Sequence, residues 1–350
     1  MIKSAHLDIA IAVSLAIAAL LTACSSGEGS SAAAPPTPPL ACDTEPVAMD
    51  LRAPGTAQPL ASVPAEWPRS EIYALPYTYV LHVPEGLPDG PVPLLVALHG
   101  LLGSGPQFAH QSEWVRFADA QKFIVVFPTG PRKWDTTPGS FDLQFVRSVI
   151  AQQRSERCID SRRVWATGHS YGGFMTQRLA CEAGDLVAAG AVVSSGNIAM
   201  PLIGGACDAG QTVPRAAGYE PVPLAFWHGT ADQVIPYEQS RLSIEAWTQR
   251  YGCTLLATEP DAPYGFVETY GACAREDIVQ HERRSGTPFT LRFHTYDGHR
   301  HGYPDGCGGQ GQLDQTGCEP DAGRWPTVDF HHAEILEFLQ ARPREHPAAE

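Results

Sequence analysis

A serine stands between two glycines in the segment Gly168-His169-Ser170-Tyr171-Gly172. The run before it, Val164 to Thr167, is apolar and is expected to form a buried strand. A serine at the tip of a sharp turn from strand to helix exposes its hydroxyl as a nucleophile, and small residues are needed where strand and helix nearly touch. The segment therefore predicts covalent catalysis by Ser170; a chance pair of loop glycines is the alternative interpretation.

A serine hydroxyl is a weak nucleophile near neutral pH, so it needs a histidine as base and an acid that orients this histidine. Asp232 lies just beyond the predicted strand Pro223–Trp227, at the edge of a parallel sheet where catalytic groups collect. We predict that Asp232 is the acid. The alternative is an aspartate that only forms a turn by bonding its own backbone.

Two histidines, His299 and His301, lie in the loop after the predicted strand Phe289–Tyr296. The order serine, acid, histidine is that of the α/β-hydrolases. Both histidines satisfy this order. The family resemblance described below favours His301 as the catalytic base and leaves His299 as the alternative catalytic histidine. The one that is not catalytic would be an ordinary loop residue, and His294 within the strand is expected to serve in packing.

A carbonyl attacked by such a serine becomes an oxyanion, which backbone amides can stabilise. The amide of Tyr171, directly after the serine, is the predicted first donor, and a loop after an early strand supplies the second. The segment from Leu98 to Gly103 fits this loop, and we predict the amide of Leu101 as the donor. Its leucine side chain is no obstacle, because the donor is a backbone group. Each donor could contribute roughly 3 to 4 kcal/mol to stabilising the transition state.

Short apolar runs alternate with longer amphipathic segments from about residue 70 onward, a pattern typical of βα units on a mostly parallel sheet flanked by helices. About 275 residues suit one large domain and are too few for two. We predict a single catalytic domain of the α/β-hydrolase fold over residues 70–343, followed by a disordered tail over 344–350. Its expected strands are Tyr77–His82, Leu94–Leu98, Phe123–Phe127, Val164–Thr167, Ala188–Ser194, Pro223–Trp227 and Phe289–Tyr296.

Helical spacing of apolar residues predicts four helices in this domain. One covers Phe141 to Ile150, the second follows the serine, and the third runs from near Glu238 to just before Gly252. The last helix begins after Thr327 and closes the domain near Arg342.

The first residues carry Lys3 and then an apolar run that ends in Leu21-Thr22-Ala23-Cys24. This run is too short for a spanning helix and has the layout of a signal peptide over residues 1–23. The cysteine segment resembles the bacterial lipobox, which predicts lipidation of Cys24; an ordinary secretory signal is the alternative. Residues 24–69, rich in small residues and proline, are predicted to be a flexible tether, which makes the chain an exported lipoprotein of the cell envelope or a secreted protein.

Eight cysteines remain after Cys24, an even set that suits disulfides in an oxidising compartment. Local spacing suggests three pairs: Cys158 with Cys181, Cys253 with Cys273, and Cys307 with Cys318. Zinc is the rival interpretation, but no CxxC pair occurs.

The formal charge of −14 argues against a nucleic-acid partner. A metal site built from His294, His299 and His301 lacks an evident carboxylate partner in the sequence. The stretch Gly308 to Gly311 lacks the ending and the preceding strand of a phosphate loop. We therefore predict no metal, no organic cofactor, and contact with a membrane only through the lipid anchor. Oligomeric state and disulfide connectivity are left open.

Three segments together, Leu98 to Gly100, Cys158 to Gly173 and Trp227 to Asp232, resemble the LpqC-type esterases, a family that groups polyhydroxybutyrate depolymerases with feruloyl and acetyl xylan esterases. The likeness extends over roughly Tyr77 to Gln340. It implies a two-step hydrolysis of a small, oligomeric or polymeric ester by Ser170 through an acyl-enzyme. No metal or organic cofactor is implied.

The catalytic histidine of that family commonly stands in a His-x-aromatic-Pro setting. His301 to Pro304 matches this setting, with Tyr303 where Trp is usual, whereas His299 does not. Tyr171 replaces the usual small or amide residue after the serine, and Leu101 replaces a common cysteine. These departures concern the substrate rather than the chemistry. Two other functions stay open: a serine peptidase, and a surface binding lipoprotein that kept the fold but lost catalysis.

Overall fold

A computed structural model describes residues 45–64, 77–130, 133–199, 207, 218–303 and 328–345. The predicted signal peptide and Cys24, the Gly308 stretch, and the cysteines at 307 and 318 lie outside these ranges. In the described part of the chain, no helix is both long and apolar enough to cross a bilayer.

Eleven strands form one sheet in the order β2-β1-β3-β5-β4-β6-β7-β8-β11-β10-β9. Its centre is parallel, as the alternating apolar runs predicted. The parallel strands are β4 (Val92–Leu98), β5 (Ile124–Thr129), β6 (Ile159–His169), β7 (Ala189–Val193), β8 (Leu224–Gly229) and β11 (Leu291–Tyr296).

Antiparallel strands extend the sheet at both edges. They are β1 (Val47–Arg52), β2 (Ala61–Ser62) and β3 (Thr78–Val83) at one edge, and β9 (Thr254–Asp261) and β10 (Gly265–Gly271) at the other. All seven predicted strands are present, and β1, β2, β9 and β10 were not predicted.

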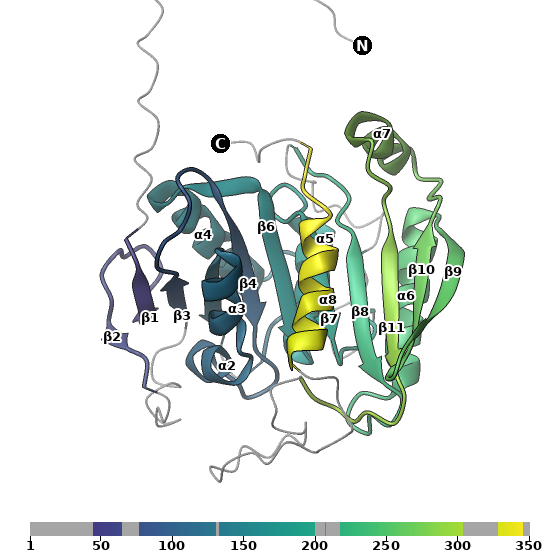
Figure 1. The fold of residues 1–350 in the computed structure, drawn as a ribbon, viewed down its shortest axis with the longest axis horizontal. Coiled ribbons are helices and arrows are strands. Elements are labelled where there is room, and N and C mark those ends of the chain that lie inside the picture. The colour runs from purple at the N-terminus through teal and green to yellow at the C-terminus, as the bar shows by residue number, and fades with distance from the viewer. Residues whose placement is uncertain are drawn as a thin grey trace, which may run out of the picture. The chain divides into compact units, whose positions relative to one another are not determined.

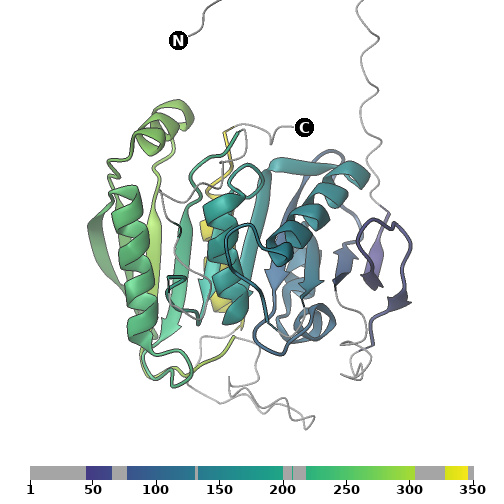
Figure 2. The same cartoon turned by 180° about the vertical axis from the view of Figure 1, so that it is seen from behind.

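Helices cover both faces of the sheet. One face carries α2 (Gly105–Gln111), α3 (Trp114–Gln121) and α8 (Val328–Gln340) (Figure 1). The opposite face carries α4 (Phe141–Glu156), α5 (Tyr171–Glu182) and α6 (Tyr237–Tyr251) (Figure 2). A short helix, α7 (Glu276–Ser285), connects β10 to β11. The four predicted helices are present, while α2, α3 and α7 were missed.

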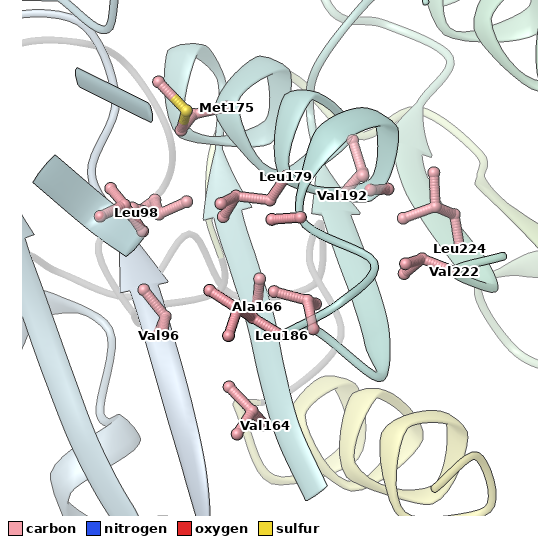
Figure 3. Close-up of a cluster of buried hydrophobic side chains, with 14 of the residues drawn as sticks. Val96, Leu98, Val164, Ala166, Met175, Leu179, Leu186, Val192, Val222 and Leu224 are labelled. Atoms are coloured by element: carbon pink, nitrogen blue, oxygen red, sulfur yellow. The ribbon is translucent and has the colours of Figure 1, made fainter. Parts of the chain in front are cut away.

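The central strands are buried on both faces because each lies between two helical layers. Along β4, Val96 and Leu98 pack into the core under α4 and α5, whereas Leu95 and Ala97 pack into the core under α2, α3 and α8. Figure 3 shows Met175 of α5 close to the strands that carry the first of these cores. Side chains of α5 therefore pack directly on the central strands β6 and β7.

The predicted tether of residues 24–69 is too long at its end. Val47 to Arg52 form β1 and pair with β3, so this segment belongs to the folded domain. At the other terminus, Arg344 was assigned to the tail, yet its side chain is buried and donates to the carbonyl of Gly218. Small residues and proline dominate the composition of residues 24–69 as a whole, so this average hid the short apolar run that forms β1.

One predicted disulfide is confirmed and one is wrong. Cys253 bonds Cys273, which joins the two ends of the β9–β10 hairpin. Cys181 bonds Cys207 instead of Cys158, and Cys158 is disulfide-bonded to another cysteine. Helix α5 contacts both β6 and β7. The rotation of this helix about its axis turns Cys181 toward the connection after β7, and sequence spacing does not reveal that rotation.

Candidate active site

Ser170 lies at the turn between β6 and α5. Its backbone has φ 53° and ψ −115°, a conformation that residues with a side chain rarely adopt. The amide of Ser170 donates to the carbonyl of Val193 at the end of β7, 2.9 Å away. Strain of this kind persists only where the surroundings enforce it, and it gathers at functional sites.

The glycines on either side of the serine stand where backbones approach closely, as the motif predicted. A Cβ on Gly168 would lie 2.2 Å from the carbonyl carbon of Gly172. A Cβ on Gly172 would lie 2.0 Å from the carbonyl oxygen of Leu98 in β4. The two glycines therefore let the helix begin directly against both β6 and the loop after β4.

Asp232 follows β8, and its two carboxylate oxygens have separate partners. Oδ1 accepts from the amides of Val234 and Ile235, both at 2.9 Å. Oδ2 accepts from Nδ1 of His301 at 2.8 Å and lies 3.2 Å from Nε2 of His228. Oδ1 thus forms the local turn, and Oδ2 contacts the predicted catalytic histidine, so one side chain fits both the turn interpretation and the catalytic one.

The carboxylate of Asp232 is fully buried. Burial alone would raise its pKa, but hydrogen bonds from His228 and His301 overcome this effect and hold the pKa well below its usual range. Asp232 is therefore an anion throughout the neutral range, and it can stabilise a positive charge on the neighbouring histidine ring.

His301 lies beyond β11 and reaches the same edge of the sheet as Ser170. Its neighbour Gly302 accepts a hydrogen bond from the hydroxyl of Ser194, 2.7 Å away. Ser194 directly follows Val193, the residue that accepts from the amide of Ser170. The ring of His301 lies 5.0 Å from the ring of His169. The histidine loop and the serine turn are thus joined through the end of β7.

His299 takes a different place. Its carbonyl accepts from the amide of Ala231, and its ring lies 5.5 Å from the ring of Tyr296 and 6.2 Å from that of Tyr264. Burial lowers the pKa of His299. Of the two candidate histidines, His301 is the one that the structure brings to Asp232.

The loop after β4 passes next to the serine. A Cβ on Gly100 would lie 3.4 Å from Cβ of Ser170, so Gly100 lies at the nucleophile and Leu101 is the next residue of the same loop. Tyr171 is the first residue of α5, and the first amides of a helix have no partner within it. Both amides that the sequence singled out therefore come from segments adjoining Ser170.

His228 was not predicted to take part, although it stands four residues before Asp232. Its Nε2 donates to the carbonyl of Ile235 at 2.9 Å and also approaches Asp232. The spacing alone could not reveal this contact, because the turn from 229 to 235 brings the two side chains together.

His294 packs as predicted, with its ring stacked on that of Trp227 at 4.7 Å, and it also has carboxylate partners that its place in the sequence did not reveal. Nδ1 of His294 lies 3.1 Å from Asp261 and 3.6 Å from Glu334, with all three residues drawn from different elements. Burial raises the pKa of Glu334 to about 8, and the charge of Asp261 adds to the rise. The hydroxyl of Tyr296 donates to Glu334 at 2.6 Å. Asp261, His294, Glu334 and Tyr296 thus form one buried polar cluster.

Comparisons with known proteins found esterases. The chain is 29% identical over 203 residues to a bifunctional acetylxylan esterase/xylanase of Neocallimastix patriciarum, covering 55% of the chain and 28% of that protein. It is 26% identical over 251 residues to poly(3-hydroxyalkanoate) depolymerase C of Paucimonas lemoignei, covering 64% and 58%. It is 29% identical over 245 residues to feruloyl esterase C of Emericella nidulans, covering 68% and 81%. The chain thus spans less than two thirds of the length of the first two proteins.

No family model matches the chain. Among solved structures, an acetyl xylan esterase from Aspergillus awamori aligns with a TM-score of 0.53 at 18% identity, over 75% of this chain and 94% of that one. This likeness concerns the fold. Together with the sheet order and the turn at Ser170, it confirms the predicted α/β-hydrolase fold.

Proposed function

We propose that the chain is a serine hydrolase that cleaves carboxylic esters through an acyl-enzyme. Ser170 attacks the ester carbonyl while His301 takes its hydroxyl proton, and Asp232 orients and stabilises the resulting imidazolium. The amides of Tyr171 and Leu101 hold the oxyanion. His301 then gives the proton to the leaving alcohol, and a water molecule releases the acid by the reverse sequence.

The hydrogen bond between Asp232 and His301 carries this proposal. The two residues are 69 positions apart, and they meet at the edge of the sheet where the strained turn holds Ser170. The low pKa of Asp232 supports its role, because an anion there favours the protonated form of His301 during attack. The chain order serine, acid, histidine and the esterase relatives agree with it.

The relatives support an acetylated or feruloylated polysaccharide or a polyhydroxyalkanoate as the source of the ester. Exposed apolar side chains in the two loops that carry the predicted site residues Leu101 and Asp232 support a substrate with an apolar part. Leu101 and Leu102 follow β4, Val234 follows Asp232, and each is at least 46% exposed. Contact with these apolar side chains would not stabilise a charged acyl group.

Hydrolysis of p-nitrophenyl acetate and butyrate by the full-length chain in mild detergent, with Ser170→Ala as the matched control, tests the reaction. We expect the variant to lose at least about 10³-fold in kcat. Equal rates for the two proteins would refute catalysis and leave a binding protein with a hydrolase fold.

A substrate panel then separates the possible esters. Methyl ferulate, acetylated xylan, hydroxybutyrate oligomers and a peptide anilide would be compared by kcat/KM. A clear preference for the anilide would turn the assignment toward a peptidase, since amide and ester hydrolysis use the same groups.

We also propose that the chain is exported and held by a lipid on Cys24. The bonds Cys181–Cys207 and Cys253–Cys273 support an oxidising compartment. Replacing Cys24 by serine should move the protein from the membrane fraction to the soluble fraction of cells. Retention of the variant in the membrane fraction would contradict the anchor.

A further inference from the structure

The side chain of His99, directly after β4, is bonded through both ring nitrogens. Nδ1 lies 2.8 Å from the carbonyl oxygen of Gly100, and Nε2 lies 3.3 Å from the amide of Gly130 after β5. A carbonyl can only accept and an amide N–H can only donate. The ring therefore carries its proton on Nδ1 and accepts at Nε2.

This protonation state is the stable one. Burial lowers the pKa of His99 to about 4, against the smaller opposing effect of its bond to Gly100. A second proton, on Nε2, would point at the N–H of Gly130. At neutral pH the side chain of His99 is therefore a fixed donor to the carbonyl of Gly100.

Neighbouring groups hold this ring in place. Nε1 of Trp134 donates to the carbonyl of His99 at 2.9 Å, and the two rings lie 4.8 Å apart. On the other side, a Cβ on Gly103 would lie 3.1 Å from Cβ of His99 and 3.2 Å from its Nδ1. The ring of His99 is thus enclosed between the loop it belongs to and the loop after β5.

The carbonyl of Gly100 and the amide of Leu101 belong to one peptide group. Among the described residues the only cis peptide bond is Ala262–Pro263, so this peptide is trans and its C=O and N–H point in opposite directions. A donor that fixes the carbonyl oxygen of Gly100 therefore also fixes the direction of the N–H of Leu101. The amide of Gly103, 3.1 Å from the same oxygen, acts in the same sense.

We propose that His99 is a positioning residue that orients the amide of Leu101 toward the oxyanion by holding the carbonyl of Gly100. The inference rests on the proposed esterase function. His99 touches neither substrate nor reacting atoms and acts only through the peptide group between Gly100 and Leu101. The loop after β5 thereby takes part in catalysis through Gly130 and Trp134.

Two substitutions at His99 separate this role from simple packing. The amide nitrogen of asparagine can occupy the place of Nδ1, and the amide of glutamine can occupy the place of Nε2. His99→Asn keeps the donor to Gly100 and loses the acceptor for Gly130, whereas His99→Gln does the reverse. Each variant keeps one of the two hydrogen bonds that the His99 ring makes and loses the other, so the two variants form a matched pair.

We expect His99→Gln to lower kcat by about 10 to 10²-fold with KM nearly unchanged, since loss of a whole oxyanion donor costs about 10²- to 10³-fold. His99→Asn should retain kcat within about fivefold of the parent on that scale. The affinity of a boronic acid, whose adduct places an oxygen at the oxyanion position, should fall in parallel with kcat. Melting temperatures of the full-length variants report whether both fold.

Equal losses in the two variants, or a loss in KM alone, would overturn the positioning role. Activity that survives in Ser170→Ala would instead overturn the esterase proposal, so the two failures are distinct. If His99→Gln does not fold, Trp134→Phe removes the bond to the carbonyl of His99 and should lower kcat and boronate affinity together. A ¹⁵N spectrum of the histidines provides a check without activity: a signal of His99 that lacks the Nδ1–H form at pH 7 would refute the proposal.

Discussion

Replacing Gly172 by alanine puts a single methyl group into the closest contact of the elbow. Its Cβ would lie 2.0 Å from the carbonyl oxygen of Leu98 and 2.8 Å from that of His99, and real Cβ atoms do not come closer than 3.0 Å to such atoms. To lengthen the distance from this Cβ to the oxygen of Leu98 from 2.0 Å to 3.0 Å, the start of α5 and the end of β4 must separate by at least 1.0 Å. Both contacts are with backbone, so no side chain can move aside.

Two effects of the alanine oppose each other. Alanine favours a helix by about 1 kcal/mol over glycine, while overpacking a rigid contact costs about 3 kcal/mol. The net loss of about 2 kcal/mol should lower the melting temperature by about 4 to 8 °C for a domain of this size. A displacement of about 1 Å at the loop that carries Leu101 should also lower kcat by about 10²-fold.

Thermal unfolding and p-nitrophenyl acetate hydrolysis of the same preparations measure both effects. Gly100→Ala is the comparison. A Cβ at this position would lie 3.1 Å from its nearest neighbour, a side-chain atom of His169, so this substitution should lower the stability by only about 1 kcal/mol. Helix propensity alone predicts the opposite order, with Gly172→Ala the more stable protein. A Gly172→Ala variant that melts at or above Gly100→Ala would refute the steric reasoning.

Three further predictions follow from the same structure. His301→Ala should lower kcat by about 10³-fold or more while His299→Ala stays within about tenfold, and loss confined to the second variant would reverse the assignment of the base. Burial lowers the pKa of His99 from 6.5 to about 4, so the unfolded chain binds more protons between these values. Stability is therefore undiminished by His99 above pH 6.5 and falls by about 3 kcal/mol as the pH falls toward 4. A urea midpoint that is unchanged between pH 7 and 4.5 would contradict this prediction. Cys181→Ser removes a bond that spans 26 residues and should cost about 3 kcal/mol of stability, and an unchanged melting temperature would show that this bond contributes little.

The centre of the fold could be predicted from the sequence because its strands are buried on both faces. Such strands are continuous apolar runs, as in Leu94–Leu98, and the turns that follow them carry the chemistry. The β9–β10 hairpin was missed for the opposite reason: Leu255 and Leu256 are exposed on its edge strand, so neither a buried run nor an alternation marks it.

The candidate site was predicted in part. Chain order and position after a strand were enough to select Asp232, whereas His301 was ranked above His299 by its resemblance to the His-x-aromatic-Pro setting of the esterase family. The contacts of His228 and His99 were not predicted, because each depends on how a loop folds back on a neighbouring element. The pairing of Cys181 was wrong since it depends on the rotation of α5 about its axis, which sequence spacing does not determine.

Helix α8 makes the middle of the sheet depend on a segment far along the chain. It packs on β7 in the middle of the sheet, its residues Leu336 and Phe338 share a core with Trp227, and its Glu334 accepts from the indole of Trp227. A ribosome must therefore synthesise the chain as far as Gln340 before the centre of the sheet can be covered on this face. A chain cut short before this helix by stalled translation would leave that face of the central strands uncovered and would present an apolar surface to the proteases that clear incomplete products.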